Sequence, residues 1–384
     1  MSLQRPALER RVVASLEAGR IPVLLGGCGV GRTSLLARLG ELVGQDRAQY
    51  LDLAACATTP ERCLSAVINA TTSGGAGSTD VFAPTAKAAF ETLLGLLDEP
   101  VSAGVPRMYL IDEFLELRTF ENFPGLRHVQ REAMQRLSQS PNRFVLTSRF
   151  TARAHRLLRD APPRFEVMHM PRLDDGEVGA LAKAISGEKT GETPAALAAT
   201  AKVWALASGR LSYASALLGH LAATNGGRSP DPVGALAALM APGGRLTALT
   251  RYSYELRLHR ARGYGALKAI LGVLAEHEPV NLTEIAHRLH RTPGSTKDYL
   301  SWLEDVDLLT VERKKYSFDD SLMRLYVRLY ARATPPTPGD IEREVDAYAT
   351  RAVAAAAVRP QEPMGDGSER PAEPGRNSGI IEID

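Results

Sequence analysis

The residues best suited to chemistry stand in a glycine-rich stretch near the N-terminus. Gly26 and Gly31 bracket four residues and are followed by a basic residue, Arg32, and a hydroxyl residue, Thr33. Such a turn aims successive backbone N–H groups into one concavity, to which the following helix adds its positive N-terminal end. Phosphate groups suit this concavity, with the cation on the outer phosphates and the hydroxyl on a bridging Mg²⁺. The predicted nucleotide-phosphate site comprises Gly26, Gly27, Cys28, Gly29, Val30, Gly31, Arg32, Thr33 and Ser34.

Arginine at position 32 changes what this loop can do, because lysine is the usual cation after such a turn. The guanidinium group is planar, larger and forked, so it can pair with two phosphate oxygens but fits poorly where a slim ammonium group threads the loop. We therefore expect nucleotide binding to survive better than hydrolysis. The alternative is that residues 26–33 are only the strand-to-helix turn of a doubly wound sheet.

Two carboxylates, Asp112 and Glu113, follow a second apolar run at residues 108–111. An aspartate at such a strand end can hold Mg²⁺ or its water, together with Thr33. A glutamate after it can orient or deprotonate an attacking water. The pair therefore predicts metal binding by Asp112 and general-base work by Glu113. Two solvated acids at a strand end are the alternative for this pair taken alone.

These residues need a sheet whose strands all end on the same side. Five apolar runs alternate with stretches of helical periodicity, which predicts parallel strands joined by helices. In such an α/β sheet, ligands bind at the C-terminal edge of the strands. We expect a parallel five-stranded sheet flanked by helices over residues 1–172, with strands at 21–25, 50–53, 108–111, 143–148 and 165–170.

The chain changes character twice after this region. Residues 173–262 carry only helical, alanine-rich patterns, which predict a helical lid. Residues 263–335 predict three helices and a basic two-stranded wing, the pattern of a winged helix-turn-helix. One more helix is expected at 336–358, and residues 359–384, rich in Pro, Gly, Glu and Arg, are expected to be disordered.

A winged helix offers two surfaces to duplex DNA. The first residues of its third helix approach base edges, and its wing touches backbone phosphates. Six residues stand at these places, with Ser295, Thr296 and Lys297 at the helix start and Arg313, Lys314 and Lys315 in the wing. DNA is therefore one expected partner. The alternative is that the module contacts a protein or serves only as a lid.

The order of these features, over about residues 5–332, resembles the archaeal-type P-loop ATPases of the AAA+/STAND superclass. That resemblance implies ATP and Mg²⁺ as cofactors. It also implies a catalytic role for the polar end of the fourth strand, where Thr147, Ser148 and Arg149 would contact the γ-phosphate or the attacking water. An ordinary surface position is the alternative for Arg149.

The same resemblance implies that Arg210 is a second sensor, which reports bound nucleotide to the lid. The sequence departs from the family pattern at Arg32 and at Gly209-Arg210-Leu211, where such ATPases commonly have glycine, a variable residue and proline. The first departure bears on hydrolysis and the second on the lid sensor. A surface arginine is the alternative for Arg210.

Three functions fit this order of motifs. The first is an ATPase switch of the AAA+/STAND type, in which nucleotide repositions a winged helix that binds DNA or a protein. The second is a non-hydrolysing, nucleotide-binding transcription regulator or adaptor, which Arg32 favours. The third is a helper ATPase for transposition or replication loading, which requires a homo-oligomer and an arginine supplied by a neighbouring subunit.

Composition bounds these choices without selecting among them. The 384 residues are 44% hydrophobic and carry a formal net charge of +2, so a globular chain is expected and nucleic acid is not indicated by net charge. The three cysteines show neither a disulfide framework nor zinc spacing. We find no signal peptide and no apolar run of about 20 residues, so we expect a cytoplasmic protein without a membrane partner.

Overall fold

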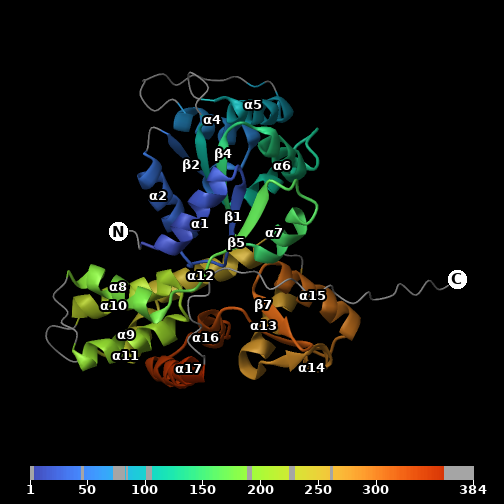
Figure 1. Ribbon diagram of the computed structural model, residues 1–384. Helices are drawn as coiled ribbons and strands as arrows, with labels where there is room; N and C mark the ends of the chain where they lie inside the picture. Colours follow the sequence, from blue (N-terminus) through green and yellow to red (C-terminus); the bar gives the residue numbers. More distant parts are fainter. Residues whose placement is uncertain are drawn as a thin grey trace.

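A parallel sheet of five strands forms the centre of the N-terminal half (Figure 1). Its order is β2-β3-β4-β1-β5, so β1 lies between β4 and β5, and β4 separates it from β3. The strands are β1 (Ile21–Leu25), β2 (Ala48–Asp52), β3 (Met108–Asp112), β4 (Arg143–Ser148) and β5 (Phe165–His169). The predicted α/β fold with a five-stranded parallel sheet is confirmed.

The computed structural model describes residues 4–358, except for 45–46, 72–82, 84, 101–105, 188–192, 225–229 and 260–262. The stretch 359–384, for which disorder is expected, lies outside the described residues. Among the described residues, no single helix is both long and apolar enough to span a membrane. The helices at Pro232–Met240 and Arg245–Leu258 meet that criterion only as a pair, and they are bent by 54°.

Helices cover both faces of the sheet because its strands are apolar on both sides. Leu24 packs against α1 (Pro6–Glu17) and α2 (Arg32–Val43), whereas Val23 and Leu25 belong to the core on the opposite face. That second face is covered by α4 (Pro60–Thr71), α5 (Ala86–Asp98), α6 (Val129–Gln139) and α7 (Thr151–Leu158). Two short helical segments, α3 (Leu53–Cys56) and η2 (Phe114–Asn122), follow β2 and β3.

Five helices follow β5 within the described part of residues 173–262, the region for which the sequence predicts only helices. Asp174 caps the first of them by accepting a hydrogen bond from Glu177 N, at 2.7 Å, and Glu177 answers as the second half of a capping box. These lid helices are α8 (Asp175–Ser186), α9 (Pro194–Ala207), α10 (Leu211–Thr224), α11 (Pro232–Met240) and α12 (Arg245–Leu258).

A second, smaller sheet lies in the C-terminal part of the chain. Its strands are antiparallel, in the order β6-β8-β7, and three helices pack with them. We call the elements α13 (Tyr264–His277), β6 (Val280–Asn281), α14 (Leu282–Arg288), α15 (Pro293–Asp305), β7 (Leu309–Glu312) and β8 (Lys315–Phe318) the small-sheet unit. Two helices, α16 (Ser321–Tyr330) and α17 (Pro338–Val358), complete the described chain.

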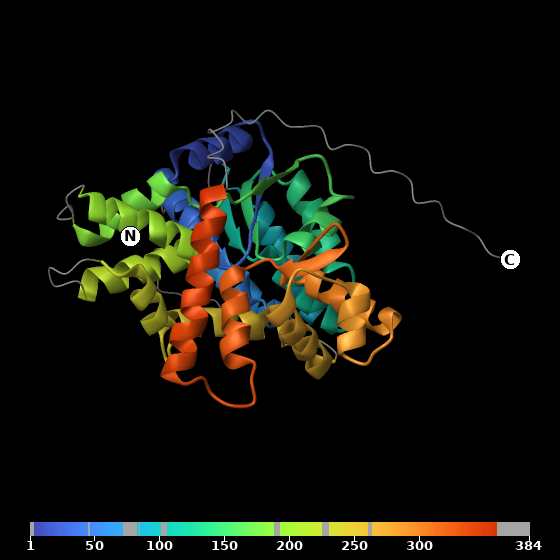
Figure 2. The same cartoon turned by 90° about the horizontal axis from the view of Figure 1, so that it is seen from below.

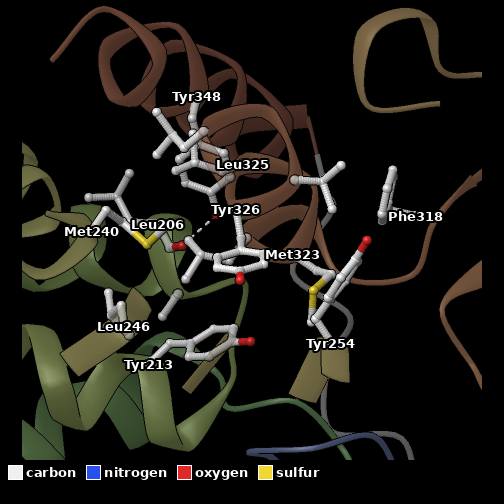
Figure 3. Packing of buried hydrophobic residues seen from close by; sticks show 14 of the residues in the cluster. Leu206, Tyr213, Met240, Leu246, Tyr254, Phe318, Met323, Leu325, Tyr326 and Tyr348 are labelled. Atoms are coloured by element: carbon white, nitrogen blue, oxygen red, sulfur yellow. Dashed lines mark hydrogen bonds between the residues drawn. The ribbon is translucent and has the colours of Figure 1, made fainter. Parts of the chain in front are cut away.

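The lid helices and the small-sheet unit share one hydrophobic core. In Figure 2 the two last helices, orange-red and red, run side by side between the lid helices and the small-sheet unit. Figure 3 shows Leu206, Tyr213 and Met240 of the lid packed around Leu325 and Tyr326 of α16. The predicted boundary at 262/263 thus separates no two cores, and the domain limits remain a prediction.

Candidate functional site

The glycine-rich loop lies where β1 ends and α2 begins, at the C-terminal edge of the sheet (Figure 1). Gly29 and Gly31 have φ angles of 82° and 98°, in the left-handed region that side chains disfavour. A Cβ atom at Gly31 would also lie 2.8 Å from Leu211 Cδ2. The left-handed backbone therefore favours glycine at both positions. At Gly31 a side chain would also collide with Leu211 of the lid.

Asp112 lies at the same edge and accepts hydrogen bonds from three hydroxyl groups. Thr33 donates to Asp112 Oδ2 at 2.7 Å, and Thr147 donates to Asp112 Oδ1. Tyr50, on the adjacent strand β2, also donates to Asp112 Oδ2, at 3.1 Å. Burial and the charge of Asp112 raise the pKa of the Tyr50 phenol. Thus the loop, β2, β3 and β4 all meet at one carboxylate, which is 4% exposed.

These groups fit a magnesium ion. Mg²⁺ prefers oxygen ligands and is usually held by one or two protein side chains together with phosphate oxygens and water. Thr33 and Asp112 offer a hydroxyl and a carboxylate within hydrogen-bonding distance of each other beside the glycine-rich loop. No cluster of three or more His, Cys, Asp or Glu residues that could hold a metal by itself occurs in the described part of the chain.

Glu113 is held between two arginines. Arg32 Nη2 lies 2.6 Å from Glu113 Oε1, and Arg149 Nε lies 2.9 Å from Glu113 Oε2. The backbone N–H of Arg149 also donates to Glu113 Oε2, at 3.1 Å. All three side chains are buried. Burial opposes the charge of Arg149, but the carboxylate of Glu113 outweighs it and raises the arginine's pKa.

The guanidinium of Arg32 contacts both the loop and Glu113. Its Nη1 donates to Gly27 O at 2.8 Å, while its Nη2 makes the contact with Glu113. A general base must have a free lone pair directed at its water. In this arrangement both carboxylate oxygens of Glu113 are paired with arginine, so Arg32 and Arg149 would compete with a water for this carboxylate, and its role as a base stays a prediction.

Arg210, for which a sensor role is predicted, lies against the glycine-rich loop. Its Nη1 donates to Cys28 O at 2.9 Å, and Ser212 N donates to Gly29 O at 3.0 Å. The other side of the guanidinium faces two acids at the end of β8, with Nη2 at 2.9 Å from Asp319 Oδ2 and Nε at 3.4 Å from Asp320 Oδ2. Arg210 is 2% exposed. It therefore joins the glycine-rich loop to the two residues that connect β8 with α16.

Apart from Thr296, the structure places one of the remaining predicted site residues in the interior and five at the surface. Ser148 is buried, and its hydroxyl accepts the N–H of Phe150 at 3.1 Å, so the structure gives it a local turn contact. Ser295 and Lys297 at the start of α15 are exposed, as are Arg313, Lys314 and Lys315.

Thr296 contradicts its predicted place at a DNA surface. Its side chain is fully buried, and its hydroxyl donates to Thr292 O at 3.0 Å. It shares the inner stripe of α15 with Leu300 and Leu303, because residues four and seven positions apart lie on one face of a helix.

Sequence reasoning missed three participants in the site. Tyr50 carries no motif, and its contact depends on β2 pairing with β3, which sequence spacing does not give. Asp319 and Asp320 stand more than a hundred residues after Arg210, and only their acidic type next to the wing is visible in the sequence.

Comparisons with known proteins place the fold. No protein-family model matches the sequence, and no curated protein matches it. A Walker-type ATPase of Pyrococcus abyssi is similar over 85% of this chain and 96% of its own, with a TM-score of 0.63 at 16% identity. The chain thus has the fold of a P-loop ATPase, and a likeness at this identity shows the fold alone.

Two further solved structures match with lower TM-scores. The Orc1 protein of Aeropyrum pernix, solved in complex with DNA, has a TM-score of 0.45 at 17% identity and covers 91% of this chain and 94% of its own. A variant of RuvB from Thermotoga maritima has a TM-score of 0.43 at 12% identity and covers 83% of this chain and 93% of its own.

Proposed function

We propose that this chain is an ATP-binding switch, in which Mg²⁺-nucleotide in the loop at 26–33 changes the position of the small-sheet unit, a winged helix that binds duplex DNA. The observation that carries the proposal is the double contact of Arg210, which reaches Cys28 O in the loop and Asp319 and Asp320 at the end of β8.

The charges explain how nucleotide would act. Phosphate groups entering the loop are anions, and they compete with Asp319 and Asp320 for the guanidinium of Arg210. A ligand shifts a conformational equilibrium by the difference of its affinities for the two states. Nucleotide therefore favours the state in which Arg210 turns toward phosphate and the acids at the wing lose their partner.

The shared core would carry this change to the small-sheet unit. Tyr213 of α10 donates to Asp320 Oδ2 at 2.7 Å. Tyr348 of α17 donates to Leu206 O of α9 at 2.7 Å (Figure 3). Close-packed interiors transmit displacements rather than absorbing them. The lid and the small-sheet unit are thus expected to move together against the sheet.

A second attachment joins the other end of the wing to the sheet. Asp307, just before β7, accepts hydrogen bonds from Thr151 N and, at 3.2 Å, from Ala152 N at the start of α7. Arg156 of α7 pairs with Asp305. The helix α7 begins three residues after β4, whose Thr147 contacts Asp112. Both ends of the wing are therefore tied to elements of the nucleotide site.

The wing itself supports a nucleic-acid partner. Its two strands are joined by Arg313 and Lys314, which have positive φ angles of 51° and 66°. Hairpin turns of this kind favour asparagine and glycine, because other side chains are strained there by roughly 1 kcal/mol each. The chain thus accepts strain to place two exposed cations at the tip, next to Lys315, where DNA phosphates would lie.

Slow or absent hydrolysis belongs to this proposal. Nucleotide must draw Arg32 away from Glu113 before the glutamate can serve as a base. The ion pair specifically favours the second function, a regulator that binds nucleotide without turnover. The helper-ATPase function gains no support from Arg149, because an arginine buried on Glu113 is not available to a neighbouring subunit.

A salt titration of duplex DNA binding tests the proposal on the full chain. It compares the wild type with a triple variant, Arg313→Ala, Lys314→Ala and Lys315→Ala, each with and without Mg²⁺-ATP. The triple variant should bind all sequences more weakly, with a log–log salt slope reduced by roughly one unit per lost phosphate contact. Nucleotide should shift the wild-type curve.

A control variant removes three exposed cations elsewhere, on α5, α6 and α9, by Lys87→Ala, Arg131→Ala and Lys202→Ala. Its curve should follow the wild type. Superimposable curves for the wild type and the wing variant would remove DNA from the function. Curves that respond to the wing but never to ATP would remove the coupling.

A further inference from the structure

Tyr50 belongs to none of the motifs described above, yet its hydroxyl contacts Asp112, a residue that would hold the metal. It belongs to β2, an edge strand of the sheet, and its hydroxyl donates to Asp112 Oδ2 at 3.1 Å. Thr33 donates to the same oxygen at 2.7 Å, and Thr147 donates to the other one. Asp112 Oδ2 thus accepts two hydrogen bonds in the described structure.

Two hydrogen bonds fill the ordinary accepting capacity of one carboxylate oxygen, because a carboxylate has about four lone-pair positions on two oxygens. The bond from Thr33 is compatible with a metal, since that hydroxyl donates its proton to Asp112 and keeps its lone pairs for the cation. The bond from Tyr50 takes the second lone pair of Oδ2, so a magnesium-bound water at this oxygen would have to displace the phenol.

Tyr50 is also not required to hold Asp112 in place. Thr33 at the start of α2 and Thr147 at the end of β4 already fix the two oxygens of that carboxylate, and Asp112 is 4% exposed. Tyr50 itself is 43% exposed. Its ring can therefore turn toward solvent, at the edge of the sheet, without opening the hydrophobic core.

We propose that Tyr50 is a positioning residue that sets how much Mg²⁺ the site needs, by competing with metal-bound water for Asp112 Oδ2. The inference rests on the proposed function, because it assumes that Mg²⁺-nucleotide occupies the loop. The tyrosine weakens the metal site, so that nucleotide is held tightly only when Mg²⁺ displaces the phenol. The switch then requires a higher Mg²⁺ concentration than the loop and Asp112 alone would set.

Substitution of Tyr50 by Phe removes the hydroxyl and keeps the ring. Calorimetry on the full chain measures the Kd of a non-hydrolysable ATP analogue, adenosine 5′-(β,γ-imido)triphosphate, across a Mg²⁺ titration and in EDTA. The Mg²⁺ concentration at half-effect should fall roughly three- to tenfold, the size of one ordinary protein hydrogen bond. The Kd in EDTA should stay unchanged.

A matched control is Tyr109→Phe. Tyr109 lies on the neighbouring strand β3 and donates to a backbone carbonyl, Leu96 O, at 3.2 Å, away from Asp112. It should show the wild-type Mg²⁺ dependence. A second variant, Tyr50→Leu, should behave as Tyr50→Phe does, and it serves if that variant does not fold. Mn²⁺ bound with the analogue should show the same order of affinities by electron paramagnetic resonance.

The outcomes separate the two hypotheses. A wild type without Mg²⁺-dependent nucleotide binding overturns the proposed function and this inference with it. A wild type that responds to Mg²⁺, beside a Tyr50→Phe variant with equal or weaker metal affinity, overturns the role of Tyr50 and leaves the proposed function standing. A similar gain in the Tyr109→Phe control also overturns it, because the effect would then belong to the sheet in general.

Discussion

Two clusters of arginine and carboxylate, in which only Asp319 is partly exposed, flank the glycine-rich loop, and they have opposite charge balance. The inner cluster, Arg32, Arg149 and Glu113, sets two cations on one carboxylate. The outer cluster, Arg210, Asp319 and Asp320, sets one cation between two carboxylates. In the proposed switch, an incoming phosphate would be attracted by the first cluster and would have to take its arginine from the second. We therefore expect the inner cluster to govern binding and hydrolysis, and the outer one to govern whether the C-terminal half responds.

The largest expected effect comes from breaking the outer cluster with Arg210→Met. Asp320, which is buried, would lose the cation that keeps its pKa low against the effect of burial. Removing one partner of a buried ion pair costs about 3–5 kcal/mol. Urea unfolding should show a loss of this size, and nucleotide should no longer alter DNA binding.

The control for that variant is Arg288→Met, which removes an exposed partner of Glu284 one helical turn away. Such pairs contribute about 0.5 kcal/mol or less. Equal losses in the two variants would contradict the distinction drawn for Arg210. A stable Arg210→Met protein that still couples ATP to DNA would show that the outer cluster carries no signal.

Breaking the inner cluster with Glu113→Gln should have the next largest effect. The neutral amide leaves Arg32 and Arg149 without a counterion, so phosphate gains two free guanidinium groups. We expect roughly tenfold tighter binding of Mg²⁺-ATP, with turnover abolished because the base is gone. Calorimetry measures the first effect and phosphate release the second.

Glu121→Gln is a matched control, because Glu121 is exposed on η2 and its contact with arginine is long, with 3.9 Å between Glu121 Oε2 and Arg118 Nε. It should bind ATP as the wild type does. Weaker binding by Glu113→Gln than by this control would mean that Glu113 organises the loop rather than competing with phosphate.

The inner cluster can be sharpened instead of broken by Arg32→Lys. An ammonium group cannot hold both Gly27 O and Glu113 in the forked manner of Arg32, and it follows the transferring phosphate more closely. We expect ATP turnover to rise by about three- to tenfold over the wild type. Arg38→Lys, on the same helix, should leave turnover unchanged, and an Arg32→Lys rate at or below the wild-type rate would contradict the argument.

The sequence was informative where function depends on neighbours in the chain. Spacing in the sequence was enough to predict the turn at Gly26–Thr33 and the pair Asp112–Glu113. The structure brings both to the C-terminal edge of the sheet. The lid helices also follow local signals, because alanine-rich runs end at recognisable caps such as Asp174. Local pattern sufficed because each of these features is built within about 15 residues of chain.

Features that depend on strand order could not be derived in this way. Spacing does not show that β4 lies between β1 and β3, nor that β2 brings Tyr50 beside Asp112. The partners of Arg210 lie across the shared core, and their positions follow from the packing of the whole C-terminal half. Thr296 was an avoidable error, since its spacing to Leu300 and Leu303 marks the buried face of α15.

The smallest expected effect tests a contact between the two halves that is made by a carboxylate and backbone N–H groups instead of an arginine ion pair. Asp307 accepts the N–H groups at the start of α7, and Arg257 and Asp319 are the charged groups that act on it. Burial raises the pKa of its carboxyl to about 6, and the two backbone hydrogen bonds and Arg257 only partly oppose this.

Because that pKa is raised above the unfolded value, the native state binds a proton more readily than the unfolded chain does. The stability that Asp307 contributes is therefore present at low pH and is lost as pH rises through about 6. Asp307→Asn removes the titration and keeps an acceptor for the backbone of α7. Relative to this variant, the wild type should lose about 1 kcal/mol of unfolding free energy between about pH 5 and pH 7.5. Urea unfolding at the two pH values measures it, with Asp346→Asn on the exposed face of α17 as control. A difference of opposite sign would mean that the hydrogen bonds outweigh burial, and the contact would then be strongest, rather than weakest, when Asp307 is charged.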